Sequence, residues 1–325
     1  MSSEDAPSCV CQALAAVTER AALGSARWLG RGDVEGAQES AASGMRAALD
    51  LLDIQGRIVI GAQEDSGPLE LGLEVGRGGV EVDLAVDPLE GASLVSRGDY
   101  GAMAMIAAGA PGAFPRLPQM YMRKMAVGPV ARGRIDLLRP VADNIHAIAE
   151  AYGRKPNDIT AIVLDRPRHH DLIEEIRASG ARIKLIQDGD VTASITAAIR
   201  GTNDHLAIGI GGARQAVISA AALRCIGGEL QAQLWPTTRS EIQQAAELGI
   251  TDVSRVFKMD ELAIGDVVVA ATGVSNSDLL RGVRYLTDSA RTQSLVMCTR
   301  HNWVRFTDGI HFFTRERREE VRLLG

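Results

Sequence analysis

The second half of the chain alternates strand-like and helix-like segments, and this alternation is the strongest constraint on its fold. Helical spacing of apolar side chains is found at residues 172–178 and 213–225. Four short apolar runs are typical of buried strands: residues 159–164, 181–186, 205–210 and 266–271. Strands that alternate with helices predict an α/β fold with a largely parallel sheet covered by helices.

The first half also contains both kinds of segment. Helices are expected at residues 10–29, 35–52 and 140–152. Strands are expected at residues 57–61, 80–87, 102–108 and 121–127. We therefore expect two lobes, each containing a sheet, with the turn at residues 153–157 as the boundary between residues 1–157 and residues 158–325.

The end of the chain is less regular. Residues 294–299 and 310–313 are β-like and fit either sheet, whereas residues 314–325 alternate arginine and glutamate, as in a solvated helix or a tail. No internal repeat or low-complexity segment is found.

Composition narrows the class of protein. The chain has 325 residues and 46% hydrophobic content, enough for a sizeable core. Its 35 basic and 41 acidic residues give a net charge of −6, which argues against nucleic acid or an anionic membrane as the main partner. No apolar run reaches the roughly 18 residues of a membrane span, and the acidic start lacks a signal peptide's basic region. We expect a cytoplasmic protein whose four scattered cysteines are free thiols.

An acidic motif at residues 82–91 predicts a metal site. In an extended strand Asp83 and Asp87 share one face, and the turn after Pro88 can bring Glu90 beside Asp87. Hard cations such as Mg²⁺ need several oxygen ligands, and clustered carboxylates are costly unless a cation neutralises them. The alternative is a strand that ends in a solvated acidic turn.

Three further motifs suit an anionic, hydroxylated ligand. The basic run at residues 166–170 lies between an expected strand and helix, which favours phosphate binding over a solvated turn. Residues 209–212 also link a strand to a helix, where backbone N–H groups attract anions, but their spacing is not that of a dinucleotide site. Asp188 and Asp190 either cap a helix or bind hydroxyl groups.

These motifs, in their order and spacing, give the chain a specific resemblance. With residues 17–23, 28–33, 58–61, 121–124 and 271–273 they resemble the class II fructose-1,6-bisphosphatases, including bacterial fructose and sedoheptulose bisphosphatases. That family belongs to the lithium-sensitive sugar and inositol phosphatase superfamily. The resemblance implies a layered α/β/α/β/α fold, a homo-oligomer (dimer or tetramer), and Mg²⁺- or Mn²⁺-dependent hydrolysis of the 1-phosphate of a ketose bisphosphate.

The resemblance also implies roles for individual residues. Asp87 and Glu90 match metal ligands, with Asp83 as a third metal candidate and Glu64 as a catalytic candidate beside Asp87 and Glu90. The expected substrate-binding residues contact the distal phosphate, the sugar hydroxyls or the glycine turn: Tyr121, Lys124, Arg166, Arg168, Asp188, Asp190, Gly211 and Gly212.

The chain departs from the family pattern where metal ligands are expected. Gln38, Ala62 and Gln215 stand where the family has acids. Ala92 replaces a threonine that orients the attacking water, Val34 replaces a lysine, and Arg214 replaces a proline. Each lost carboxylate weakens cation binding.

Two hypotheses remain. The chain is a sugar-phosphate phosphatase with a reduced Mg²⁺ or Mn²⁺ centre, or it is a sugar-phosphate-binding homologue that has lost phosphatase activity. The second hypothesis includes different chemistry and a regulatory or structural pseudoenzyme. No nucleic-acid or membrane partner is expected in either case.

Overall fold

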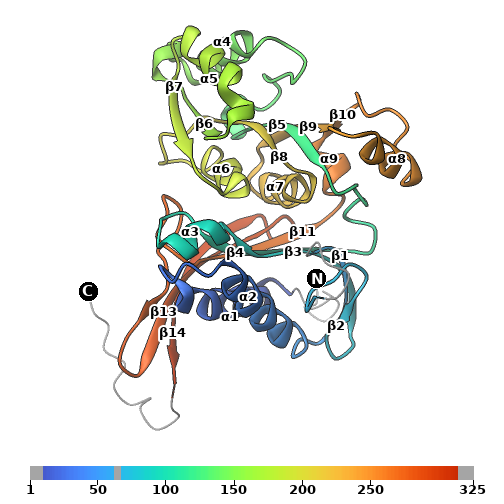
Figure 1. The fold of residues 1–325 in the computed structure, drawn as a ribbon, viewed down its shortest axis with the longest axis vertical. Helices are drawn as coiled ribbons and strands as arrows, with labels where there is room; N and C mark the ends of the chain where they lie inside the picture. The colour runs from blue at the N-terminus through green and yellow to red at the C-terminus, as the bar shows by residue number, and fades with distance from the viewer. Residues whose placement is uncertain (1–9, 62–66, 314–325) are drawn as a thin grey trace, which may run out of the picture.

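The chain forms five layers of helices and sheets, as a computed structural model shows for residues 10–61 and 67–313 (Figure 1). From one end, the layers are a helix pair, a sheet, a central helix layer, a second sheet and an outer helix pair. Three apolar clusters fill the spaces between these layers, and the central cluster contains side chains from both sheets. The predicted layered α/β/α/β/α fold is confirmed.

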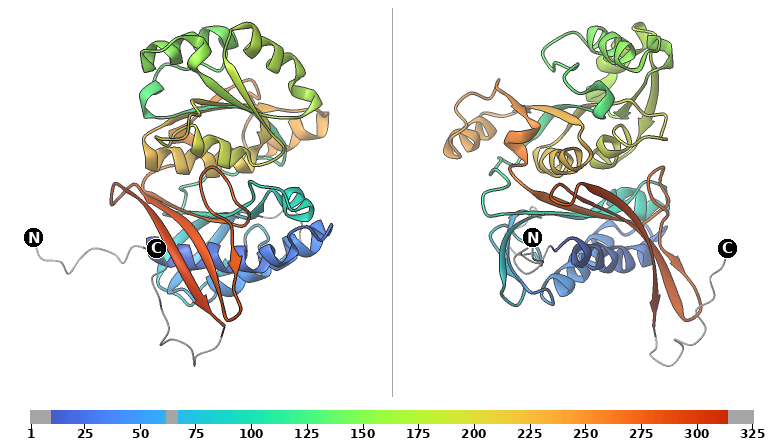
Figure 2. Two further views of the ribbon diagram at one scale, coloured as in Figure 1. Left: turned by 90° about the vertical axis from the view of Figure 1, so that its left-hand side faces the viewer. Right: turned by 180° about the vertical axis from the view of Figure 1, so that it is seen from behind.

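The first sheet has eight strands in the order β12-β13-β11-β4-β3-β1-β2, with β14 paired to β13. Its strands are β1 (Ile54–Ile60), β2 (Glu74–Val75), β3 (Val80–Glu90), β4 (Met103–Gly109), β11 (Val267–Gly273), β12 (Arg284–Tyr285), β13 (Ser289–Cys298) and β14 (Trp303–Phe312). Among the described strand pairs of this sheet, only β1–β3 is parallel. The β13–β14 hairpin extends beyond the body of the protein (Figure 2).

The second sheet has six strands in the order β10-β9-β5-β8-β6-β7. They are β5 (Tyr121–Val127), β6 (Thr160–Leu164), β7 (Arg182–Ile186), β8 (Leu206–Gly212), β9 (Glu229–Trp235) and β10 (Val256–Lys258). Of the strand pairs that the structure describes in this sheet, only β6–β7 and β6–β8 are parallel, so the prediction of a largely parallel sheet is wrong. The cause is that β5 lies between β8 and β9 and runs antiparallel to both.

The helices complete the layers. Helices α1 (Cys11–Ser25) and α2 (Val34–Leu49) cover the outer face of the first sheet, and α4 (Val141–Tyr152) and α5 (His170–Ala178) cover that of the second (Figure 1). Between the sheets lie α6 (Asp190–Thr196) and α7 (Ala213–Ile226). Most side chains of α7 are buried, as expected for a helix enclosed by two sheets. The short helices are α3 (Ala92–Arg97), α8 (Arg239–Glu247) and α9 (Met259–Leu262).

The sheets do not divide the chain at residue 157. Strand β5, from the first half, lies in the second sheet, and β11 to β14, from the second half, lie in the first sheet. The proposed lobes 1–157 and 158–325 therefore differ from the two sheets. The physical reason is that strand pairing follows register and burial across the fold, which the position of a turn in the sequence does not report.

Two other expectations concern the cysteines and the membrane. Cys225 is a buried free thiol and Cys298 is buried beside His301, whereas Cys11 is disulfide-bonded, so the free-thiol prediction is wrong for Cys11. Among the helices of residues 10–61 and 67–313, none is long and apolar enough to cross a bilayer. The expected tail at residues 314–325 lies outside the described residues.

Candidate functional site

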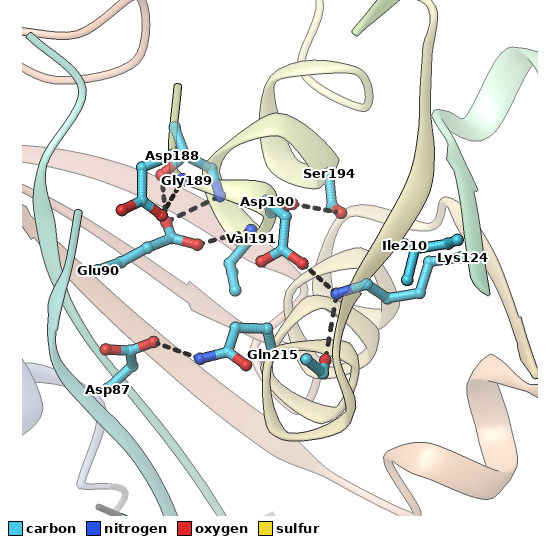
Figure 3. Close-up of polar contacts among 12 residues, drawn as sticks. Asp87, Glu90, Lys124, Asp188, Gly189, Asp190, Val191, Ser194, Ile210 and Gln215 are labelled. Atoms are coloured by element: carbon cyan, nitrogen blue, oxygen red, sulfur yellow. Dashed lines mark hydrogen bonds and ion pairs between the residues drawn. The ribbon is translucent and has the colours of Figure 1, made fainter. Parts of the chain in front are cut away.

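Two acidic side chains lie where the first sheet meets the central helices (Figure 3). Asp87 and Glu90 occupy the last residues of β3, and the register of β3 against β4 shifts between them. Such an irregularity redirects side chains at the end of a strand. It brings both carboxylates toward α6 and α7, which carry residues far away in the sequence.

Glu90 joins the first sheet to the start of α6. Its Oε1 accepts a hydrogen bond from the backbone N–H of Val191 at 2.7 Å. Its Oε2 accepts two more from Thr192, at 3.1 Å from the backbone N and 2.6 Å from Oγ1. The carboxylate therefore satisfies donors that a helix start leaves unpaired, and it fixes the position of Asp190 at the beginning of α6.

Lys124 and Asp190 form a buried ion pair beneath the glycine turn. Lys124 Nζ donates to Asp190 Oδ2 and, at 3.2 Å, to the carbonyl oxygen of Gly212. Side-chain exposures of 8% and 17% show that this ion pair is largely shielded from water. A Cβ atom at Gly211 would overlap Asp190 Oδ2 and lie 2.8 Å from Lys124 Nζ. Glycine at position 211 therefore makes room for the ion pair.

Asp188 and Ser93 add a second contact between the two halves of the site. Ser93 Oγ donates to Asp188 Oδ2 at 3.1 Å, and the backbone N–H of Gly189 donates to Asp188 Oδ1 at 2.9 Å. Ser93, the second residue of α3, was not among the candidate site residues. Its partner lies 95 residues away, so no local pattern could have identified it.

The electrostatics of the cluster favour a cation. Burial raises the pKa of Asp87, and hydrogen bonding from Gln215 opposes this rise. Burial, and then the charges of Asp190 and Asp87, raise the pKa of Glu90 well above its usual range. Carboxylates that repel one another in a shielded site become more acidic when a cation binds between them. This observation is the structural support for a metal-binding role.

The cluster suits one divalent cation better than several. Asp87 and Glu90 keep oxygen lone pairs that their hydrogen bonds do not use. At the position of the third expected acid, Gln215 Nε2 donates a hydrogen bond to Asp87 Oδ2 at 3.1 Å. Gln38 is exposed on α2. Asp87 and Glu90 are therefore carboxylates that could hold a divalent ion.

Other predicted metal-site residues lie elsewhere or outside the described chain. Asp83 lies four residues before Asp87 on β3, a distance of roughly 13 Å in a strand. Its Oδ2 accepts a hydrogen bond from the backbone N–H of Gly112 at 2.7 Å, in a buried position. The structure therefore does not bring Asp83 to the Asp87–Glu90 pair. Glu64 and Ala62 lie outside the described residues.

The predicted phosphate-binding side chains lie near the ends of three strands of the second sheet, β6, β7 and β8. The Arg168 guanidinium lies 4.7 Å from the centre of the Tyr121 ring and donates to the carbonyl oxygen of Ile210 at 3.0 Å. Arg166 donates to the carbonyl oxygens of Asp165 and Gln187, at 2.9 and 2.5 Å. Each guanidinium has donors left for a phosphate. Lys124 differs from this group, because Asp190 neutralises it.

A buried histidine supports this group from below. His169 Nε2 accepts a hydrogen bond from the backbone N–H of Ile210 at 2.7 Å, so its Nδ1 carries the proton and donates to the carbonyl oxygen of Leu164 at 2.7 Å. Burial lowers the pKa of His169, which favours the neutral ring that these two bonds require. His169 belongs to the basic run at residues 166–170 and was not among the candidate site residues. The structure assigns it a bridging role between β6 and β8.

Comparison with known proteins identifies the family. Residues 9–311 match the family described as "Bacterial fructose-1,6-bisphosphatase, glpX-encoded". The chain is 41% identical to a D-fructose 1,6-bisphosphatase class 2/sedoheptulose 1,7-bisphosphatase of Synechococcus sp. (strain JA-3-3Ab), over 91% of this chain and 93% of that protein. A protein of the same name from Microcystis aeruginosa is 39% identical, over 94% and 97%. The chain therefore belongs to the bacterial class 2 fructose-1,6-bisphosphatase family.

Proposed function

We propose that this protein hydrolyses a phosphate ester of a sugar bisphosphate, with a ketose 1,6- or 1,7-bisphosphate as its substrate. The single observation that carries this proposal is the meeting of Asp87, Glu90 and Asp190 at the junction of β3, α6 and α7. Membership of a family whose named relatives are sugar bisphosphatases supports the same reaction.

In this proposal, Asp87 and Glu90 hold one Mg²⁺ or Mn²⁺ ion. Such an ion supplies Lewis-acid stabilisation of phosphoryl oxygens and activation of water. Glu90 at the same time anchors α6, and Asp188, oriented by Ser93, accepts hydrogen bonds from the sugar hydroxyls. Lys124 and Asp190, which form an ion pair, line a small cavity together with Gly211.

Arg166, Arg168 and Tyr121 bind the distal phosphate in this proposal. Guanidinium groups suit a phosphate dianion because they offer several donors in a planar arrangement. Their backbone hydrogen bonds hold both arginines in position before substrate arrives. Gly211 and Gly212 allow the backbone to approach the ligand closely.

The test is phosphate release from fructose 1,6-bisphosphate and sedoheptulose 1,7-bisphosphate with Mg²⁺ or Mn²⁺. We expect Asp87→Asn to lose at least about 100-fold in activity, because the substitution removes a ligand charge from the metal site. Asp83→Asn is the matched control, since Asp83 lies on the same strand and is buried but contacts Gly112 instead. Equal activity of Asp87→Asn and the wild type would refute the proposed site.

The second hypothesis is a sugar-phosphate-binding homologue without phosphatase activity. The Gln215 amide donates to Asp87, and Lys124 is committed to Asp190, so protein donors satisfy groups that a metal centre would otherwise use. A protein of this kind would be stabilised thermally by a sugar bisphosphate and would release no phosphate from it. Its oligomeric state, which we propose to be a dimer or tetramer, would then be part of its function.

A further inference from the structure

Arg214 reaches from the central helix layer to the first sheet. It is the second residue of α7, and its Nη1 donates to the carbonyl oxygen of Gly61, just beyond the end of β1. Strands β1 and β3 are parallel neighbours, with Ile60 in register with Ala85. Gly61 therefore lies beside the segment of β3 that leads to Asp87, and the Arg214 guanidinium is held at the acidic end of that strand.

The charge of Arg214 is close to Asp87. Burial lowers the pKa of Arg214, and the negative charge of Asp87 opposes this fall. In turn, the positive charge of Arg214 lowers the pKa of Asp87 against the effect of burial. Even so, Arg214 forms no direct ion pair with any residue in the part of the chain that the structure describes.

Most donors of the Arg214 side chain remain available. A guanidinium carries five N–H donors, and one hydrogen bond to Gly61 is found for Arg214 among the described residues. The side chain lines a cavity of about 350 Å³ together with Tyr121, Gly212 and Gln215. This cavity adjoins the reacting end of the site, because Gln215 also donates to Asp87. Its volume is within the range of small-molecule sites.

Compared with the family pattern, the chain has fewer acids at the expected metal site and one additional cation, Arg214. Gln38, Ala62 and Gln215 are neutral where the resemblance expects acids, and Arg214 stands where it expects proline. Gly61, the acceptor of the Arg214 hydrogen bond, immediately precedes position 62. A fixed guanidinium thus lies at the strand end where the family pattern has a metal-binding acid.

We propose that Arg214 binds the phosphoryl group that is transferred. Because Gln38, Ala62 and Gln215 cannot bind metal ions as carboxylates would, the positive charge of Arg214 replaces part of the charge that further metal ions would supply. This inference rests on the proposed function, since it names a residue of the same site. It differs from the family pattern, because the phosphoryl oxygens are held partly by a protein cation beside a single metal ion. Phosphate binding should therefore persist when divalent metal is removed.

The experiment measures the affinity for inorganic phosphate by calorimetry in EDTA. We expect the wild-type protein to bind phosphate without metal, and Arg214→Gln to weaken this binding about 10- to 150-fold, the range of a hydrogen bond to a charged group. Arg214→Lys keeps the charge without the planar donors and should fall between the two. Arg224→Gln is the matched control, because Arg224 lies on the same helix and also donates to a backbone carbonyl, that of Gly265.

A family-like double variant tests the replacement of metal charge directly. Arg214→Pro with Gln215→Glu restores the family residues, and proline is tolerated in the first turn of a helix. Phosphate binding beside Asp87 should then require Mg²⁺ or Mn²⁺, so this variant in EDTA should bind phosphate no better than Arg214→Gln. Failure of the wild type to bind phosphate in EDTA, or equal affinities of the wild type and Arg214→Gln, would overturn the inference.

The outcomes separate this inference from the proposed function. Metal-free phosphate binding that depends on Arg214, in a protein that releases no phosphate from any ester, would support phosphate binding by Arg214 and reject the hydrolase. If the wild type hydrolyses the ester and Arg214→Gln binds phosphate as tightly as the wild type, the hydrolase is supported and the role of Arg214 is rejected. Thermal unfolding of each variant identifies any loss of affinity that comes from misfolding.

Discussion

Gly211→Ala should destabilise the protein at the candidate site, because a methyl group at this position has no space. The new Cβ would overlap Asp190 Oδ2 and lie 2.8 Å from Lys124 Nζ and 3.0 Å from Asp190 Cγ. The backbone of Gly211 is free of positive-φ strain, so the substitution acts through these contacts alone. Either the ion pair between Lys124 and Asp190 separates, or the start of α6 moves.

The magnitude follows from packing and burial. Inserting a methyl group into a well-packed region costs about 1–3 kcal/mol, and breaking a buried ion pair by removing one partner costs about 3–5 kcal/mol. Because the pair keeps side-chain exposures of 8% and 17%, and both partners remain present, the second cost applies only in part. We expect Gly211→Ala to lower the free energy of unfolding by about 2–4 kcal/mol.

The assay is urea unfolding of Gly211→Ala beside Gly67→Ala, together with phosphate release. A Cβ at Gly67 would have no atom of the described residues within 4 Å, so that control should change stability by less than about 1 kcal/mol. In an Asp190→Ala background, Gly211→Ala should cost at least about 1 kcal/mol less, because the overlapping carboxylate is absent. Equal effects of Gly211→Ala in both backgrounds would refute the reasoning.

Three further predictions concern pH, the histidine support and assembly. The pKa values of Asp87 and Glu90 are raised in the folded protein, so the stability tied to their protonated forms is present below their unfolded pKa values and is lost as pH rises through the folded pKa values. Mg²⁺ should therefore raise the melting temperature more at pH 8 than at pH 5. An equal rise at both pH values would contradict this. The pKa of His169 is lowered in the folded protein, so its contribution to the free energy of unfolding is present above pH 6.5 and is lost as pH falls. His169→Phe should lower the free energy of unfolding by about 2–5 kcal/mol at pH 8, because it leaves two backbone groups unpaired, and should flatten the pH dependence of unfolding between pH 5 and 7. An unchanged pH profile would argue against the assigned role. Light scattering should give the mass of a dimer or tetramer, and a monomer at micromolar concentration would reject that proposal.

The local features of the fold could be predicted from the sequence, because they depend on patterns within a few residues. Residues 121–127 were expected as a strand and form β5. Strand β9 was missed, although Leu230, Ala232 and Leu234 alternate with polar residues and are buried. Pairing between strands was predicted less well, because β5 lies between two strands from the other half of the chain.

The candidate site was partly predictable for the same reason. Asp87 and Glu90 are close in sequence, so strand periodicity and a turn sufficed to place them together. The partners of Glu90 lie 101 and 102 residues away on α6, and only the packed layers bring them into contact. Asp83 has the correct periodicity but lies too far along β3, which shows that sharing a face of a strand does not mean sharing a site.

The most direct test of the proposed function is the fate of fructose 1,6-bisphosphate followed by phosphorus NMR with Mg²⁺ or Mn²⁺. We expect the signal of the 1-phosphate to disappear while inorganic phosphate and a sugar monophosphate form, with Asp87→Asn at least about 100-fold slower and Asp83→Asn close to the wild type. A wild-type protein that binds the bisphosphate and leaves both phosphorus signals unchanged would contradict the account.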